Sequence, residues 1–343
     1  MSITFISINE ADAVGARELL VRMSWKRDWS EDLVERYFSW RYGARGTGET
    51  LVACKEGRCV GILDSFIRPY SIAGRQEVVR ETCDWFCLPE YRPLGVGLHL
   101  MRQMMAKPEP ILVIGGTDDT RNLLPRLKWA QLPDVDNFIL GISARTVAGL
   151  VARRWSRGGS KFARVIPEIP LVPRLPQWAP PSANSRVRIH VLGEAEQVPK
   201  IAPYDLAPAL DTEVLDWLSC APAVLGQFLL LDFLCDGEPA GISISRLEKV
   251  PDVGCISQIV HLHATRFELI NWMASATVGH LIERGAGVVL CRASCPTTAR
   301  ALSALGFWRR KPIAAHWWPP NKLPQPGLLH LTALQADDAL QFY

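Results

Sequence analysis

The stretch "YRPLGVGLHL", Tyr91–Leu100, places an arginine and two glycines directly before an apolar, helix-like run. Gly95 and Gly97 have no side chains, so the backbone there can approach a ligand closely and adopt unusual φ values. A helix that begins here exposes unpaired N–H groups and a partial positive charge, which suit a diphosphate. The stretch therefore predicts a pyrophosphate-binding loop, for which the candidate residues are Arg92, Pro93, Leu94, Gly95, Val96, Gly97 and Leu98.

Two glycines before a helix also fit a tight strand-to-helix turn that binds nothing, and the loop alone leaves that alternative open. The pattern is neither a GxGxxG dinucleotide fingerprint nor a phosphate loop ending in Gly-Lys-Ser/Thr. The helix that follows has Gly97, Leu100, Met101 and Met104 at the spacing of one buried face.

The segment "LPEYRPLGVGLHLM" resembles the CoA-binding motif of the GNAT superfamily of acyl-CoA-dependent N-acyltransferases. That motif reads Arg/Gln-x-x-Gly-x-Gly/Ala, follows a strand and a proline, and precedes a helix. Arg92, Gly95 and Gly97 fill its fixed positions after Pro89. The resemblance covers residues 1–145 and implies acetyl-CoA or another acyl-CoA as co-substrate, an amine acceptor and no metal.

The resemblance also implies roles for the strand that precedes the loop. Backbone groups near Phe86, Cys87 and Leu88 would bind the pantetheine arm, and an N–H there would polarise the thioester carbonyl. Glu81 lies eleven residues before Arg92, where the family often carries its general base. Asp84 is a second candidate, expected on the opposite strand face by parity. A salt-bridged, structural Glu81 is the alternative.

Two positions depart from the family pattern. Asp118, in "GGTDDTRN", stands where the family often has an asparagine, and we expect it near the cofactor. Leu124 stands where the family often has a tyrosine acid. A thiol with a pKa of ~8.5 can leave as thiolate without that acid.

The elements around these residues predict an α/β fold with a mixed sheet. In residues 1–145 a strand, two helices and a hairpin precede the long strand "EVVRETCDWFCLP"; the loop, a helix, "ILVIGG", a short helix and "NFILGIS" follow. Residues 186–343 repeat this order more faintly, with a hairpin turning at Asp236-Gly237. We therefore expect two tandem GNAT-like domains, each a mixed central sheet flanked by helices.

The second domain is expected not to bind CoA. In place of the loop it has "HLHATRFELIN", with no glycine and with bulky side chains. His261 and His263 fall on one strand face. They could line an acceptor site or form a polar sheet face, and no third metal ligand is evident.

Residues 146–185 are expected to form a connector between the domains. Prolines at 167, 170, 173, 176, 180 and 181 favour extended chain. From Ser143 to Arg188 there are nine basic residues and one acid, Glu168, so this stretch carries +8 in a chain of net +3. A solvated connector and a docking strip for a polyanion both fit.

Composition indicates a globular protein with 48% hydrophobic and 21% charged residues. The first twenty residues do not read as a secretory signal, and no apolar run reaches the ~18 residues of a membrane span. Nine cysteines without a CxxC pair read as reduced thiols, so we expect a cytoplasmic protein without membrane contact. The small net charge argues against nucleic acid as a general partner.

The expected function is transfer of an acyl group, acetyl in the simplest case, from acyl-CoA to an amine of a small molecule, amino sugar or peptide. The sequence leaves two alternatives open. One is an aminoacyl-tRNA-dependent transferase of the peptidoglycan-bridge type, which the basic connector would suit. The other is a non-catalytic CoA-binding or sensing module, which Leu124 favours. Oligomeric state cannot be inferred from the sequence.

Overall fold

A computed structural model describes residues 3–8, 13–22, 30–42, 48–155, 166–171, 175–190, 192, 198, 202–322 and 327–335. The chain divides into two compact units. Unit 1 comprises Met1–Pro133 with Ala314–Pro326, and unit 2 comprises Asp134–Ile313 with Gly327–Tyr343. Of the basic connector residues, Arg157, Lys161, Arg164 and Arg174 lie outside the described residues.

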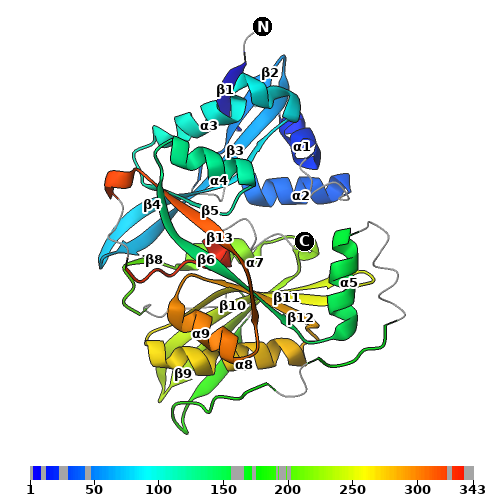
Figure 1. Ribbon diagram of the computed structural model, residues 1–343, viewed down its shortest axis with the longest axis vertical. Helices are drawn as coiled ribbons and strands as arrows, with labels where there is room; N and C mark the ends of the chain where they lie inside the picture. The colour runs from blue at the N-terminus through cyan, green and yellow to red at the C-terminus, as the bar shows by residue number, and fades with distance from the viewer. Residues whose placement is uncertain are drawn as a thin grey trace. The chain divides into compact units, whose positions relative to one another are not determined.

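Unit 1 is a mixed sheet with helices against it (Figure 1). Its strands follow the order β1-β2-β3-β4-β5-β13, antiparallel except for β4 with β5. The elements are β1 (Thr4–Ser7), α1 (Ala13–Arg22), α2 (Glu31–Tyr42), β2 (Leu51–Lys55), β3 (Arg58–Ile72), β4 (Arg75–Cys87), the 3-10 helix η2 (Pro89–Leu94), α3 (Val96–Met105), β5 (Ile111–Ile114) and α4 (Asp118–Arg126).

The edge of unit 1 beyond β5 comes from the far end of the sequence. β13 (Trp308–Trp318) pairs its residues Ala315–Trp318 antiparallel with β5. Trp317 is fully buried there, and the Trp318 indole N–H donates to the Met105 carbonyl at 3.2 Å. Apolar burial of this late strand extends the sheet of unit 1 by one strand beyond β5.

Unit 2 repeats the plan, with strand order β6-β12-β11-β10-β9-β7 and one parallel pair, β11 with β12. Its elements include β6 (Ala130–Gly141), α5 (Ala144–Trp155), β7 (Arg186–His190), β8 (Leu206–Pro208), α7 (Thr212–Ser219), η3 (Ala223–Leu225), β9 (Gln227–Cys235), β10 (Glu238–Val250), β11 (Gly254–Ala264), η4 (Phe267–Leu269), α8 (Ile270–Glu283), β12 (Val288–Ala293), α9 (Pro296–Ala304) and η6 (Ala333–Gln335).

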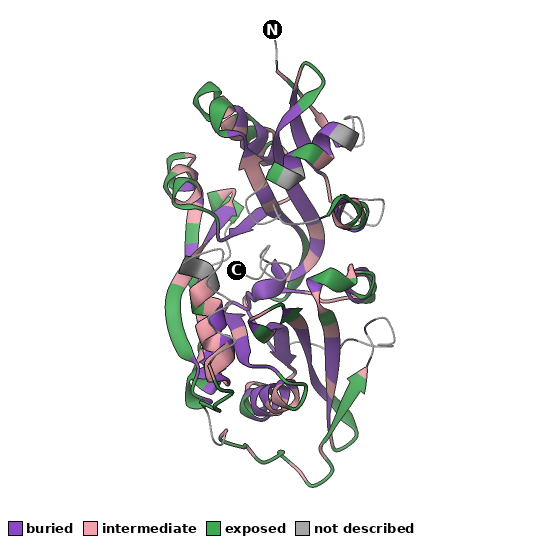
Figure 2. Ribbon diagram, turned by 90° about the vertical axis from the view of Figure 1, so that its right-hand side faces the viewer, coloured by how far each residue is buried: buried purple, intermediate pink, exposed green. Residues whose placement is uncertain are grey.

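Helices cover both faces of this second sheet. α8 and α9 pack together on one face around a core that includes Phe233, Met273 and Leu302 (Figure 1). Leu150 of α5 packs against Val250, Val253 and Ile256. Figure 2 shows the strands mostly buried and the helices exposed on their outer sides. Two tandem mixed sheets flanked by helices confirm the predicted fold class. The helix α5 was not predicted, because the connector was expected to start at residue 146.

The hairpin turns follow the predicted chemistry. In the β2–β3 turn Glu56 and Gly57 have φ of 53° and 76°, and in the β9–β10 turn Asp236 and Gly237 have φ of 54° and 88°. Acidic residue followed by glycine is the sequence typical of two-residue hairpin turns with positive φ at both positions. The same solution at matching places supports the duplication.

Both units interrupt their central ladder at matching points. The β4–β5 ladder runs from Arg80–Ile111 to Thr82–Val113, and the β11–β12 ladder ends at Ile259–Cys291. Just beyond each end, the neighbouring antiparallel ladder is shifted by a β-bulge, at Asp84 in β4 and near Val260 in β11. A bulge re-aims the strand and ends regular pairing, so each sheet opens into a wedge.

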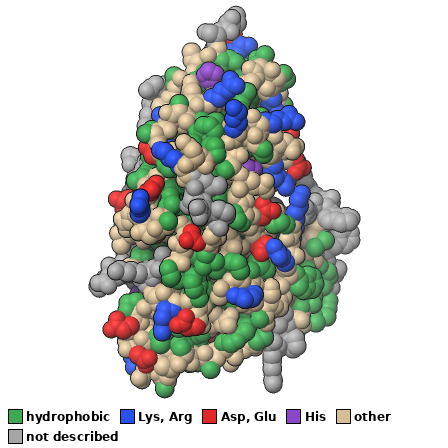
Figure 3. All heavy atoms as spheres, turned by 60° about the vertical axis from the view of Figure 1, so that its left-hand side comes forward, with side chains coloured by type: hydrophobic (Ala, Val, Ile, Leu, Met, Phe, Trp, Pro, Cys, Tyr) green, Lys and Arg blue, Asp and Glu red, His purple; other side chains and the backbone are tan. Residues whose placement is uncertain are grey.

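The described part of the chain holds no helix long and apolar enough to cross a membrane. On the face in Figure 3, basic, acidic and hydrophobic side chains are interspersed.

Candidate active site

The predicted phosphate loop lies at the mouth of the unit 1 wedge. After β4 the chain forms η2, and then Gly95 adopts the left-handed conformation with φ 73° and ψ 19° as the residue before α3. The first intrahelical bond runs from the His99 N–H to the Gly95 carbonyl at 2.9 Å. The N–H groups of Val96, Gly97 and Leu98 precede that bond and therefore have no acceptor within the helix.

The two glycines of the loop serve different needs. A Cβ on Gly95 would meet no heavy atom within 4 Å, so glycine is required there by the positive φ and not by space. A Cβ on Gly97 would come within 3.3 Å of the Trp85 indole nitrogen, which donates to the Gly97 carbonyl at 3.0 Å. Gly97 thus lets α3 lie close against β4.

The loop is accessible and carries a cation. Arg92, Pro93 and Leu94 are exposed, and Gly95, Gly97 and Leu98 are half-buried. The Arg92 guanidinium donates through Nε to the Cys87 carbonyl at 3.3 Å and lies 3.9 Å from the Asp119 carboxylate. A helix N-terminus beside an arginine fits the chemistry of a diphosphate.

The other predicted cofactor residues lie next to this loop, and several of their polar groups already have hydrogen-bond partners. The Leu88 N–H already donates to the Val60 carbonyl at 2.9 Å, while Phe86 and Cys87 pair with Ile62 and Gly61 of β3. Burial raises the pKa of the Cys87 thiol. Asp118 is exposed at the start of α4 and bonds to Arg121, so its neighbour Asp119 is the acid that faces Arg92.

Glu81 is a buried carboxylate with two defined partners. Its side chain accepts a hydrogen bond from the Tyr70 hydroxyl at Oε1, and its Oε2 lies 3.3 Å from Arg68 Nη1. Burial raises the pKa of Glu81, while Arg68 and Tyr70 act in the opposite direction. Tyr70 itself is fully buried and its pKa is well above the usual value, so its hydroxyl stays protonated and keeps donating.

Asp84 belongs to a second buried cluster, centred on Arg41. Its carboxylate accepts from the Tyr42 hydroxyl at 2.6 Å and lies 3.6 Å from Arg41 Nε. Arg41 also contacts the Cys83 thiol at 2.7 Å and Asp64 at 3.4 Å. Burial raises the pKa of Asp64 to about 6.

The expectation that Asp84 lies on the opposite face from Glu81 is wrong. Asp84 has φ 48° and sits in the β-bulge, which breaks the two-residue period of the strand. Cys83, which shares the face of Glu81, and Asp84 both reach Arg41. The bulge thereby gathers both candidate carboxylates around one region of β4.

Sequence reasoning missed the partners of these acids, although the chain carries a signal for them. Asp64, Arg68 and Tyr70 stand at even-numbered positions of β3, on the face that also carries Phe66, and all three are buried. Polar residues at every second position of an otherwise apolar strand indicate a polar row on one sheet face. Leu124 is fully buried in α4, as a core residue.

The wedge of unit 2 is filled by the chain itself. Beyond β12, Ser294 N–H donates to the Leu331 carbonyl at 3.0 Å, and Leu331 N–H donates to Ser294 Oγ at 2.8 Å. On the β11 side, Thr332 Oγ1 lies 3.2 Å from His261 Nδ1. Residues 329–335 are all buried, so this segment occupies the gap between the two strands.

His261 of β11 bonds to this segment, residues 329–335, which we call the plug. The Thr332 hydroxyl donates to Gln335 Oε1 at 3.0 Å, so it can only accept from His261 Nδ1–H. His261 Nε2 then accepts from His263 Nδ1–H at 2.9 Å. His330 packs against His261 and stacks on Tyr204. Among the described residues, no group of three or more His, Cys, Asp or Glu side chains is arranged to hold a metal ion.

Comparison with known proteins shows the fold. No family model matches the sequence, and no curated protein sequence matches it. The structure is similar to a GCN5-related N-acetyltransferase from Anabaena variabilis, with a TM-score of 0.60 and 12% identity over 92% of this chain and 72% of that one.

Two further solved structures are similar over most of both chains. Saccharomyces cerevisiae N-myristoyltransferase with bound myristoyl-CoA gives a TM-score of 0.62 at 10% identity, covering 96% of this chain and 89% of that one. A tandem GNAT protein from the clavulanic acid biosynthesis pathway gives 0.52 at 11% identity, covering 92% and 98%. The chain therefore has a fold similar to that of these GNAT proteins, in a tandem arrangement, as the order of its elements predicted.

Proposed function

We propose that the protein is an N-acyltransferase whose unit 1 binds acyl-CoA, with acetyl-CoA as the simplest donor, and acylates an amine. One observation carries the proposal. Gly95 in the left-handed conformation starts α3 close to Arg92, just after the end of β4, whose ladder with β5 has already stopped at Thr82. The similarity of the fold to N-acetyltransferases and to a myristoyl-CoA-bound transferase supports it.

In this proposal each part of unit 1 has a chemical task. The N–H groups of Val96, Gly97 and Leu98 and the Arg92 guanidinium bind the diphosphate. Bound acyl-CoA supplies an acyl group activated as a thioester. Glu81 accepts the proton of the amine, and its raised pKa suits that task. Arg68 and Tyr70 act as positioning residues, because they hold the Glu81 carboxylate in one orientation.

The test is a titration of acyl-CoA into wild type and into two matched glycine variants. Gly95→Val and Gly237→Val both force a β-branched residue into a positive φ where a Cβ meets no neighbour. Each should cost roughly 1–3 kcal/mol of stability. Only Gly95→Val should also weaken acyl-CoA binding, by more than about tenfold, since it re-aims the amides. Equal affinities for folded Gly95→Val and wild type would refute the diphosphate site.

A non-catalytic CoA-binding module is the second candidate, favoured by two observations. Leu124 is a core residue with no proton to give, and Glu81 is already engaged by Arg68 and Tyr70. Mass spectrometry of a panel of amines incubated with protein and the best-binding acyl-CoA separates the two candidates. Tight binding without any acylated amine would favour the module. Activity that needs aminoacyl-tRNA and falls steeply with salt would favour the transferase of the peptidoglycan-bridge type.

A further inference from the structure

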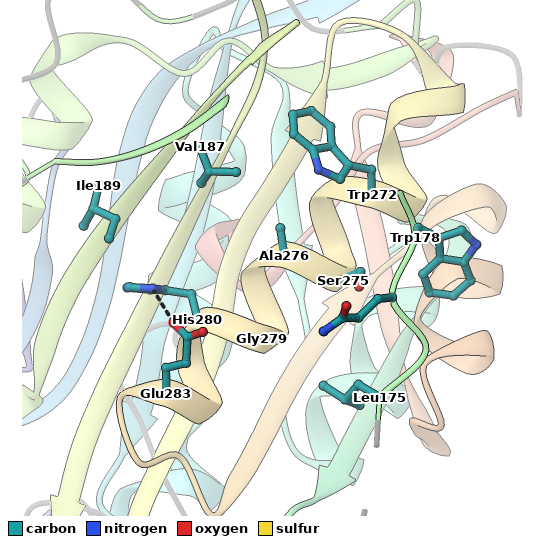
Figure 4. Close-up of a pocket in the computed structure, with 11 residues that line it drawn as sticks. Leu175, Trp178, Val187, Ile189, Trp272, Ser275, Ala276, Gly279, His280 and Glu283 are labelled. Atoms are coloured by element: carbon teal, nitrogen blue, oxygen red, sulfur yellow. Dashed lines mark ion pairs between the residues drawn. The ribbon is translucent and has the colours of Figure 1, made fainter. Parts of the chain in front are cut away.

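Unit 2 has a groove of about 370 Å³ along the outer side of α8. Six residues of α8 at spacings of three and four line it: Trp272, Ser275, Ala276, Gly279, His280 and Glu283. Figure 4 shows Val187 and Ile189 of β7 on one side of the helix and Leu175 and Trp178 of the extended connector on the other. Ala276 and Gly279 leave room between these walls, because a Cβ on Gly279 would meet nothing within 4 Å.

The strand beside the groove has an open edge. β7 pairs antiparallel with β9 and is the last strand in the order of unit 2, so its other edge has no strand partner in the described chain. Val187 is 41% exposed and Ile189 is 50% exposed, both facing the groove. Exposed apolar side chains on an uncovered edge strand form a ready template for another strand.

The opposite face of β7 is basic. Arg186 and Arg188 alternate with the two apolar residues and are exposed. Arg188 pairs directly with Asp232 of β9, and His190 lies 3.9 Å from the same carboxylate. Asp232 is thus the one carboxylate described beside Arg186 and Arg188, so this face of β7 carries a net positive charge. A strand added here would gain most from acidic side chains on that face.

A second copy of this chain does not fit the edge. In a two-fold symmetric antiparallel pairing of β7 with itself the two faces match, so Arg186, Arg188 and His190 of both strands would share one face. Like charges that lie opposite one another across strands are destabilising. The occupant must therefore differ from β7 in charge.

We propose that β7 binds an extended segment of a partner protein in which acidic and β-branched apolar residues alternate. The segment adds as a strand to the free edge, with its backbone paired to β7. Its apolar side chains lie with Val187 and Ile189 over the groove, towards Trp178 and Leu175. Its acidic side chains lie beside Arg186 and Arg188. This site is independent of the acyl-CoA site proposed for unit 1.

The experiment uses the full chain and a dye-labelled synthetic peptide that alternates Asp with Val and Ile, read by fluorescence anisotropy. Wild type should bind it saturably, and a matched peptide with Lys for every Asp should bind at least about tenfold more weakly. Ile189→Asp should weaken the acidic peptide by a similar factor. Val224→Asp, at an equally exposed apolar side chain in η3, should leave its affinity unchanged.

Charge reversal supplies the sharpest outcome. The double variant R186E/R188E should lose the acidic peptide and gain the lysine peptide, which a change in folding alone would not produce. No saturable binding of the acidic peptide at about millimolar concentration overturns the proposal. Equal binding of both peptides to wild type overturns it as well. So does a concentration-dependent dimer that Ile189→Asp abolishes, since the occupant would then be a second copy.

Discussion

The two units have a similar gap between two parallel strands, but the residues that follow the gap differ. In unit 1 the ladder between β4 and β5 stops at Thr82, and the glycine loop at the N-terminus of α3 follows. In unit 2 the ladder between β11 and β12 stops at Ile259, and the buried segment 329–335 bonds to both sides of the gap. The protein itself thus closes the opening in unit 2, whereas in unit 1 we propose that the opening receives acyl-CoA.

The two units also differ in the residues at the positions of the buried carboxylates of unit 1. Counting back from the last paired residue before each bulge, Ser257 of β11 stands where Glu81 stands in β4, and Ser245 of β10 stands where Asp64 stands in β3. Unit 2 therefore has hydroxyl groups at positions where unit 1 has buried carboxylates. Where no reaction occurs, a buried charge only costs desolvation free energy, so its replacement by serine is the expected result.

The comparison shows that the gap in the sheet does not depend on the side chains proposed to bind or react. A bulge and a shortened parallel ladder suffice to open the sheet, whichever side chains follow. Binding then depends on whether the next residues present amides or a plug. The largest test of that separation is at the pair Glu81 and Ser257.

Glu81→Gln should reduce acyl transfer by roughly 10²–10⁴-fold, because glutamine cannot accept the proton of the amine. Acyl-CoA affinity should change little, since Glu81 is not part of the phosphate loop. Ser257→Ala, the matched change in unit 2, should leave the rate within about twofold of wild type. The measurement is initial rate against acyl-CoA concentration, beside thermal unfolding of each variant. If Glu81→Gln is fully active, Glu81 is not the general base. Asp84 is then the remaining candidate, and the activity of Asp84→Asn tests it.

How far the sequence predicts this molecule depends on whether a feature is local. The loop at Arg92–Leu98 and the hairpin turn at Asp236-Gly237 follow from residues that lie next to each other. Both need backbone conformations that few residue types adopt, so the residue types reveal them. The fold class follows from the order of such local elements.

Features that depend on distant residues were not predictable in this way. The pairing of Ala315–Trp318 with β5 joins residues about 200 positions apart, and the sequence of neither strand indicates its partner. The plug at 329–335 reads as LHLTALQ, a short mixture of apolar and polar residues that is equally typical of a strand or a buried turn. The bulge at Asp84 has no glycine or proline to mark it, and a single missed bulge inverted the expected facing of that carboxylate.

The plug of unit 2 should make the protein sensitive to acid through His330. Burial, with His263 nearby, lowers the pKa of His330 from 6.5 to about 3. The groups packed around it are His261, His263 and Tyr204. Between these two pH values the unfolded chain binds a proton that the folded chain does not, so stability falls as pH falls below 6.5.

His330→Phe keeps the ring that stacks on Tyr204 and removes the titrating group. We expect the variant to lose stability with acid less steeply than wild type, by roughly 1 kcal/mol per pH unit between pH 6 and 4. Urea unfolding at a series of pH values measures this difference. Parallel stability curves for the two proteins would show that the plug does not hold a neutral histidine.

Asp64 of unit 1 should give a smaller effect with the opposite sign. Burial raises its pKa from 3.8 to about 6, with Asp84 adding to the rise while Arg41, Thr50 and Cys83 oppose it. Between those values the folded chain binds the extra proton, so Asp64 contributes stability that grows as pH falls from 6 to 4. Asp64→Asn, which preserves the shape of the side chain, should remove that gain.

The double variant of Asp64→Asn and His330→Phe tests whether the two units contribute independently to the pH dependence of stability. The two residues have no partner in common, so their contributions to the pH dependence should add. Relative to wild type, Asp64→Asn makes the loss of stability in acid steeper, His330→Phe makes it shallower, and the pair should fall between them. If both single variants shift the slope in the same direction, the contrast is wrong, because one buried acid and one buried base cannot both favour the same protonation change.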